Sequence, residues 1–304
     1  MRRWLWAGVV LCGVLCGCVS SGGQRTGGGR LAAAGGFGLP AGGELYVYAD
    51  VAPLRPLLVV LLARAHLTHG SVRRILEKTA RAGVVLFPAG EGESFIVCLR
   101  GSGYPALGAA LSFALSRDWK REKSGGGQFW RSARAGFGVR ISPAEIRLTA
   151  PQKAAQNPSP PASAALSPPP RFWAWAGEAA AAGWSPDAAL LNKFLKQRRI
   201  AIQFPAKFLF FALLPEPAAA GGERRWFLRL SIEAENAARA QSILSLLAIV
   251  KNALDEGEPN MRRLPEIAKI ILRANTSLDG ASVRIETESF SEDVLLTLIE
   301  AVRK

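Results

Sequence analysis

The first eighteen residues constrain this chain most, because they decide where folding can begin and in which compartment it happens. Arg2 and Arg3 form a short positive segment, and an apolar, uncharged run of about twelve residues follows at 4–15. That length is typical of a secretory signal peptide and too short to cross a bilayer as a helix. The sequence therefore predicts export, with the folded part starting further along the chain.

The end of the apolar run carries a second signal. Leu15 stands three positions before Cys18, and the small residue Gly17 stands directly before it. This pattern resembles the lipobox of bacterial lipoproteins, in which the cysteine thiol receives a diacylglyceryl group and the chain is cut before it. The resemblance implies that 1–17 is a lipoprotein signal peptide and that Cys18 is the lipidation site. A plain cleaved signal peptide and an uncleaved anchor are the alternatives.

Residues 18–42 are rich in Gly and Ser and poor in large apolar side chains. Such a segment buries too little surface to order itself, so we expect a flexible tether between the anchor and the folded part. Two or more acyl chains on Cys18 would anchor the protein stably. Cys98 would then have no intrachain disulfide partner, and its apolar neighbours predict a buried strand residue rather than a nucleophile.

The charge balance is basic: 38 Lys and Arg face 24 Asp and Glu, a formal net charge of +14. Basic proteins bind nucleic acid, anionic lipid or acidic polymers. Export argues against nucleic acid, which leaves membrane lipid, in particular anionic lipid, as the expected partner. Simple solubility, or a genome that favours Arg and Ala, explains the same excess of charge.

The spacing of apolar residues predicts an α+β fold, with antiparallel sheets packed against amphipathic helices. A Pro- and Ala-rich linker or loop at 151–170 separates a first α+β unit at 43–150 from a second at 171–304, and the two units are expected to be similar. We expect strands near 44–49, 84–87, 95–99, 129–130, 137–141, 145–149, 172–175, 208–214, 226–233 and 282–287. We expect helices near 54–67, 72–82, 105–115, 186–197, 236–253, 265–274 and 294–302.

Several of these helices carry wide apolar stripes. Two readings stay open: the stripes enter the lipid as interfacial helices, or they form the core of an ordinary α+β domain. The residues expected to contact the membrane in the first reading are Leu57, Leu58, Leu61, Ile243, Leu246, Leu247, Val250, Leu295, Leu298 and Ile299.

Signatures of catalysis are sparse. His66 and His69 stand close together, but no Cys or carboxylate stands nearby to complete a metal site. We find no phosphate-binding Gly-rich loop, no nucleophile elbow and no zinc-protease helix motif. The sequence therefore predicts a protein that is not an enzyme and that needs no cofactor or metal.

The lipobox, the Gly/Ser tether, the strand Leu45–Asp50 and the Trp119–Lys123 stretch before an aromatic strand resemble spirochaetal outer-membrane lipoproteins of the treponemal type. The resemblance implies a lipid-anchored protein on the periplasmic side of the outer membrane, whose amphipathic helices insert into the inner leaflet and which binds lipid or another apolar ligand. Val19 also differs from the Asp that retains some lipoproteins at the inner membrane. The alternative is a lipid-tethered periplasmic binding or scaffold module without helix insertion.

Overall fold

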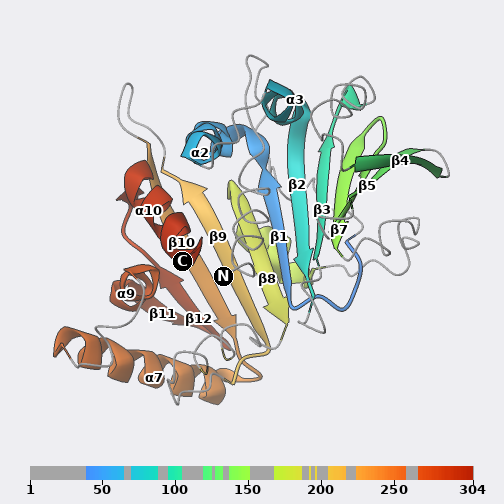
Figure 1. Cartoon of the computed structure of the whole chain (residues 1–304). Helices are drawn as coiled ribbons and strands as arrows, with labels where there is room; N and C mark the ends of the chain where they lie inside the picture. The colour runs from blue at the N-terminus through green and yellow to red at the C-terminus, as the bar shows by residue number, and fades with distance from the viewer. Residues whose placement is uncertain are drawn as a thin grey trace. The chain divides into compact units, whose positions relative to one another are not determined.

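The computed structural model describes residues 39–64, 70–87, 95–104, 119–124, 127–132, 137–150, 168–186, 192, 196, 205–216, 224–257 and 266–303. The described chain is α+β, with large antiparallel sheet and a few helices (Figure 1). It divides into two compact units, with the boundary between Ala181 and Ala182. The two units are treated separately below.

The strands of the first unit run in the hydrogen-bonded order β1-β2-β3-β7-β6-β5-β4, and all neighbouring pairs are antiparallel. Their bounds are β1 Leu45–Asp50, β2 Thr79–Leu86, β3 Phe95–Gly101, β4 Trp119–Ser124, β5 Gly127–Ser132, β6 Gly138–Ile141 and β7 Glu145–Ala150. Each of the strands expected in this part is confirmed. Strands β6 and β7 form a hairpin, and its turn is closed by the Ser142 N–H, which donates to the Glu145 carbonyl at 2.8 Å.

Alternation along these strands builds the core. On one face of the sheet, Val84 lies opposite both Val47 and Val97. On the same face, Leu148 lies opposite both Val97 and Val139. Each of these valines is at most 7% exposed. Side chains of residues two apart on a strand share a face, so the intervening residues point to the opposite side. The opposite face carries Tyr46 and Tyr48 at β1 and polar residues further across the sheet.

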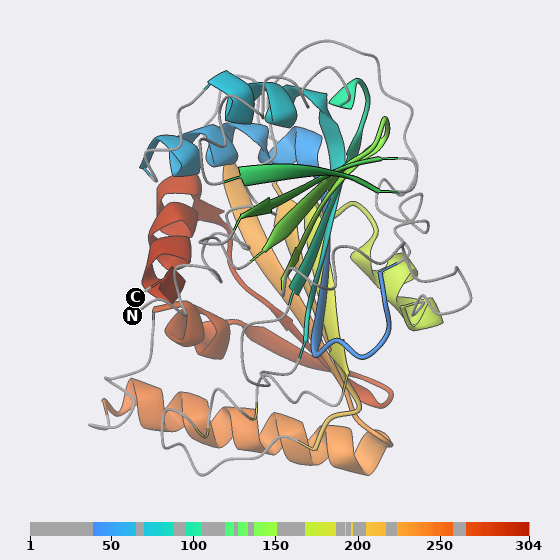
Figure 2. The ribbon, with the colours of Figure 1, turned by 45° about the vertical axis from the view of Figure 1, so that its right-hand side comes forward.

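Three helices accompany this sheet: α2 Val51–Arg64, α3 Gly70–Lys78 and α5 Pro170–Ala176. Figure 2 shows α5 on the side of the sheet away from α2 and α3. The helix expected at 72–82 ends at Lys78, and Thr79 already begins β2. A Cβ atom on Gly101 would lie 1.7 Å from the Lys78 carbonyl oxygen, so only glycine lets the end of β3 pass the end of α3.

The aromatic segment 172–175, expected to be a strand, is part of the helix α5, and this prediction is wrong. Pro170 occupies the first turn, where a missing N–H costs nothing and a fixed φ favours the helix. Phe172 and Trp173 then pack on Tyr48, with ring centroids 5.9 and 5.0 Å away. The aromatic side chains that suggested a strand therefore pack on β1 from a helix.

The strands of the second unit run in the order β11-β12-β10-β9-β8, with β13 also on β10. Their bounds are β8 Ala181–Pro186, β9 Phe208–Pro215, β10 Arg225–Glu233, β11 Asn275–Asp279, β12 Ser282–Glu286 and β13 Phe290–Ser291. The helices are α7 Ala237–Asp255, α9 Glu266–Arg273 and α10 Glu292–Arg303. The expected strands near 208–214, 226–233 and 282–287 and the expected helices near 236–253, 265–274 and 294–302 are confirmed.

A cluster of apolar side chains holds α7 against β10 and β12. Ile243 is fully buried, Leu247 is buried, and both belong to one core cluster with Ile232, Val283 and Ile285. Asn236 caps the helix, because its Oδ1 accepts the backbone N–H of Arg239 at 2.9 Å.

Some expectations lie outside the described residues. These are the signal peptide 1–17, most of the tether 18–42, the helix 105–115, most of the linker 151–170 and most of the helix 186–197. The last residues of the predicted tether are described and belong to the fold. Leu39 is only 1% exposed, and the Tyr46 hydroxyl donates to the Pro40 carbonyl at 3.1 Å.

Candidate functional site

The predicted lipidation site, Cys18, lies outside the described residues, as do His66 and His69. No helix in the described ranges has both the length and the apolar character needed to cross a membrane. Within the same ranges, no group of His, Cys, Asp and Glu side chains is arranged to hold a metal ion. The candidate surfaces are therefore the apolar helices and the charged residues of the sheets.

On α2, the three residues expected to contact a membrane point into the protein. Leu57 and Leu58 are fully buried and Leu61 is 3% exposed. Small residues opposite each other in the sheet, Ala49 and Ala82, are also fully buried. In this conformation the α2 leucines are core residues, and their contact with membrane lipid stays a prediction.

α7 divides its expected contact residues between the core and the surface. Ile243 and Leu247 belong to the core cluster, Leu246 packs half-buried against it, and Val250 is half-buried. Ile249 lies beside them and is 63% exposed, the largest exposure among the described bulky apolar side chains. Leu246, Ile249 and Val250 share one flank at helical spacing, and we call them the α7 flank.

On α10, Leu295 is 7% exposed and therefore buried, and the structure does not describe the side chains of Leu298 and Ile299. Val294, beside Leu295, is 38% exposed. The burial of Leu295 has the same cause as that of the α2 leucines: the helix packs its apolar side on its own unit, through β10 and β13.

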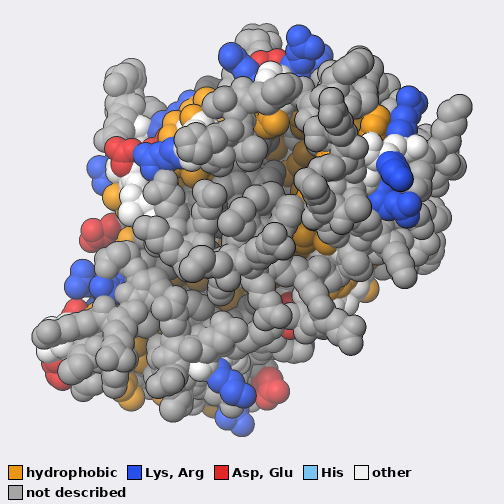
Figure 3. Space-filling view, viewed as in Figure 1, with side chains coloured by type: hydrophobic (Ala, Val, Ile, Leu, Met, Phe, Trp, Pro, Cys, Tyr) orange, Lys and Arg blue, Asp and Glu red, His pale blue; other side chains and the backbone are white. Residues whose placement is uncertain are grey.

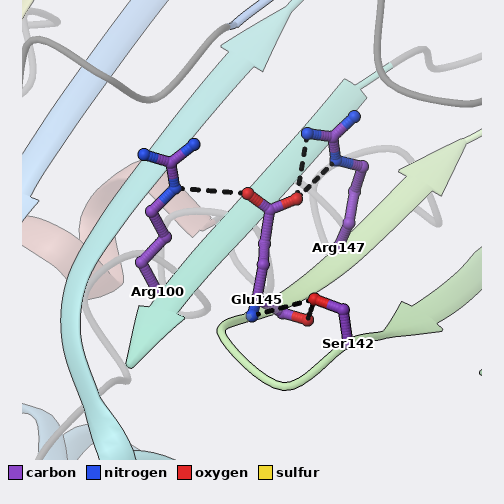
Figure 4. Close-up of polar contacts among 4 residues, drawn as sticks. All are labelled: Arg100, Ser142, Glu145 and Arg147. Atoms are coloured by element: carbon purple, nitrogen blue, oxygen red, sulfur yellow. Dashed lines mark hydrogen bonds and ion pairs between the residues drawn. The ribbon is translucent and has the colours of Figure 1, made fainter. Parts of the chain in front are cut away.

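The most concentrated polar arrangement of the first unit lies at the end of β3 and β7, shown in Figure 4. The Arg147 guanidinium contacts Glu145 Oε1 through Nε at 3.0 Å and Nη2 at 2.9 Å. Arg100 Nε approaches Glu145 Oε2 at 3.3 Å. The hydroxyl of Ser142 holds the turn by accepting the Glu145 N–H at 3.1 Å. One carboxylate thus partners two arginines.

Burial sets the chemistry of this arrangement. The side chains of Arg147 and Glu145 are 11% and 19% exposed, so they interact in a poorly screened environment. Cys98 lies opposite Arg147 in the β3–β7 ladder and is fully buried. Burial raises the pKa of its thiol to about 12, against the smaller opposing effect of Arg147. The prediction of a buried strand cysteine is confirmed.

Sequence reasoning missed this cluster. Arg100 and Glu145 are 45 positions apart, and only the antiparallel register of β3 with β7 makes them partners. The spacing of Glu145 and Arg147, two positions apart in a strand, was the one local sign that they share a face.

Comparison with known proteins shows the fold. No family model matches the sequence, and no curated protein matches it. Crystal forms III, I and IV of the treponemal protein TP0453 superpose with TM-scores of 0.54, 0.54 and 0.52. Their sequence identities to this chain are 16%, 19% and 18%. The first two matches cover 87% of this chain and 96% of TP0453, and the third covers 90% and 99%.

Proposed function

We propose that this chain is a non-enzymatic lipoprotein, anchored by acyl chains on Cys18 at the periplasmic side of an outer membrane, where it contacts lipid. The observation that carries the proposal is the pattern Leu15-Cys16-Gly17-Cys18 directly after a signal-length apolar run. The likeness to TP0453 supports it as a shared fold with a treponemal protein.

The spacer sets how closely the folded part is held. About twenty residues separate Cys18 from Leu39, and the flexible tether that the sequence predicts there would have an end-to-end distance of about 25 Å. The anchor would therefore keep the folded units at the bilayer at an effective concentration near the millimolar range. Contacts that are weak in solution would then be occupied.

The anchor is tested directly in cells. The native chain should partition with the membrane fraction and carry the mass of a diacylglyceryl-modified Cys18 at its new amino terminus. A Cys18→Ala variant should remain full length and lose the acyl mass, whereas Cys16→Ala, the neighbouring control, should keep both processing and lipid. An unmodified thiol at position 18 in the native product would overturn the anchor.

For direct lipid contact we propose the α7 flank, because it combines an exposed Ile249 with half-buried Leu246 and Val250. The chain from residue 19 onward keeps every described residue and is the form to test. It should float with anionic vesicles at low salt and shift its Trp emission to the blue. Ile249→Ser should weaken flotation severalfold, whereas Leu278→Ser, a control that is 42% exposed on β11, should not.

The runner-up is a tethered periplasmic binding or scaffold module without helix insertion. Burial of Leu57, Leu58, Leu61 and Leu295 favours it, since insertion of α2 or α10 would require those helices to leave their own core. A chain that stays in solution with vesicles, and that copurifies with an apolar ligand, would support this second function over the first.

A further inference from the structure

β11 is the outermost strand of the second unit's sheet, and its outer side is open. It pairs with β12 on one side, and no described strand pairs with the other (Figure 1). All five of its residues are exposed. A strand in this position presents a row of backbone N–H and C=O groups to any further strand.

Two hydrogen bonds between β10 and β12 show which backbone groups of β12 face β11. The Thr287 N–H donates to the Leu228 carbonyl at 3.0 Å, and the Ala234 N–H donates to the Ala281 carbonyl at 2.9 Å. Hydrogen-bonded pairs alternate along an antiparallel ladder, and this one has no bulge, so the odd-numbered residues of β12 bond to β10. The even-numbered residues of β12 therefore turn their backbone groups toward β11.

The same alternation assigns the backbone groups of β11. Asn275, Ser277 and Asp279 lie opposite even-numbered residues of β12, so their N–H and C=O groups bond to β12. The N–H and C=O groups of Thr276 and Leu278 point the other way, toward the open edge. The Leu278 side chain is 42% exposed beside them. A further antiparallel strand would bond to these two residues.

The edge strand of the first unit differs from β11 in its charge. β4 carries exposed Lys120 and Arg121, and Figure 3 shows Lys and Arg side chains around it. Charged side chains, prolines and bulges on an edge strand oppose pairing with another chain. β11 contains no Lys, Arg or Pro, and its register with β12 is uninterrupted. Its one charged residue, Asp279, forms an ion pair with Arg284 of its own hairpin.

The sequence of β11 is complementary to itself when two copies run antiparallel around Ser277. Thr276 then lies opposite Leu278 of the second copy, and the reciprocal pair completes four backbone hydrogen bonds. Asn275 lies opposite Asp279 of the second copy, so its side-chain amide can donate to that carboxylate. The second carboxylate oxygen lets Asp279 keep its intrachain ion pair. No like charges oppose each other in this register.

We infer that β11 is a dimerisation edge, on which two copies of this chain join their sheets antiparallel about a two-fold axis at Ser277. The argument is self-complementarity: a two-fold interface must match itself, and this strand bonds its outward backbone groups and balances its polar side chains when it pairs with itself. One added strand on each side buries little surface, so the dimer belongs to the weak and transient class. The inference goes beyond the proposed function and does not need the lipid anchor.

Cross-linking tests the register, in the chain from residue 19 onward. Ser277 would face itself as a non-hydrogen-bonded pair, with Cα atoms about 4.5 Å apart, which a disulfide can bridge. Oxidised Ser277→Cys should therefore form a covalent dimer. The matched control is Asn275→Cys, equally exposed on β11, whose two cysteines would lie about 14 Å apart in this register. The other cysteine of that chain, Cys98, is fully buried.

The covalent dimer should form at least about tenfold faster for Ser277→Cys than for Asn275→Cys, because disulfide geometry is met only in the first. Equal rates would show random collision between exposed thiols and would overturn the inference. Cross-linking of residue 277 to a different periplasmic protein, with no dimer of this chain, would overturn it as well.

Charge substitutions test the same pairing without a cysteine. Asn275→Asp places a like charge opposite Asp279 of the second copy, twice in each dimer, and should weaken self-association about threefold or more. Asn275→Lys places an opposite charge there and should strengthen self-association by a similar factor. Sedimentation velocity measures both variants. Changes in the same direction, or no change in either, would contradict the pairing.

A proline separates association from folding. Thr276→Pro removes an N–H that points to the open edge, so the bonds from β11 to β12 remain and the melting temperature should stay near the native value. The same change should abolish self-association and the cross-linking of Ser277→Cys. If Thr276→Pro does not fold, the two Asn275 variants decide. A native chain that stays monomeric up to about 1 mM would overturn the inference, whatever the state of Cys18 in cells.

Discussion

At the scale of single residues, the burial of the Cys98 thiol can be tested by chemical labelling. Its pKa of about 12 leaves roughly one thiol in ten thousand ionised at pH 8, and the side chain is fully buried. We expect no labelling of the native chain from residue 19 by a thiol reagent at pH 8. Complete labelling should appear in denaturant. Labelling at the rate of a free cysteine in the folded chain would contradict this burial.

Loss of Glu145 should destabilise the fold. A Glu145→Ala change leaves the largely buried Arg147 guanidinium without its carboxylate, and breaking such a pair costs on the order of 3 kcal/mol. Urea unfolding should report the loss. Glu286→Ala is a suitable control, because its partner Arg229 is more exposed and solvent screening keeps such a loss below about 1 kcal/mol. Equal losses would show that burial does not strengthen the Glu145 contacts.

At the scale of elements, Asn236 offers a test of α7. Asn236→Ala removes the side-chain acceptor of the Arg239 N–H and should cost about 1 kcal/mol of unfolding free energy. Asn236→Ser should retain most of the stability, because a hydroxyl oxygen caps nearly as well. Thermal unfolding measures both. A stability ranking with Ala above Ser would contradict the cap.

Some strands could be predicted from the sequence pattern and others could not. Strands rich in β-branched and aromatic residues, such as 95–99 and 208–214, were predicted because side-chain pattern and burial agree there. β11, Asn275–Asp279, was missed because every residue of this edge strand is exposed, so no apolar alternation marks it. β8 was missed because its Ala- and Gly-rich sequence carries little β propensity.

The candidate site was less predictable than the fold. The lipobox is a short motif that can be recognised in the sequence alone. Whether the apolar side chains of a helix are buried or exposed depends on what packs against the helix. The α2 leucines and Ile249 lie in similarly apolar sequence, yet the former are buried and the latter is exposed. The contact between Arg100 and Glu145 depends entirely on the register of two distant strands, which no local pattern contains.

At the scale of the whole molecule, alkaline pH should unfold the chain earlier than its neutral stability suggests. Burial raises the pKa of Cys98 to about 12 from an ordinary value near 9, and that of Tyr104 to about 12 from near 10. Above pH 9 the unfolded chain releases these protons before the folded chain does, so stability falls as pH rises toward 12.

Denaturant unfolding at pH 8 and pH 11 measures this decline. The variant combining Cys98→Ala with Tyr104→Phe should show a smaller fall between the two pH values than the native chain. Tyr46→Phe provides a comparison, since the pKa of Tyr46 is also raised by burial and its hydroxyl accepts the Gly43 N–H. An identical fall in the double variant would contradict the assignment.

Helices and strands meet in this chain without intervening residues: α2 begins at Val51 directly after β1, and β2 begins at Thr79 directly after α3. Neither junction has a loop residue between helix and strand that could accommodate an inserted or deleted residue. One residue inserted after Lys78 would turn β2 over, sending Arg81 toward the valine core and Ala82 toward the face that carries Tyr48. We therefore expect insertions and deletions to be tolerated in the connecting segments and to destabilise the fold at these two junctions.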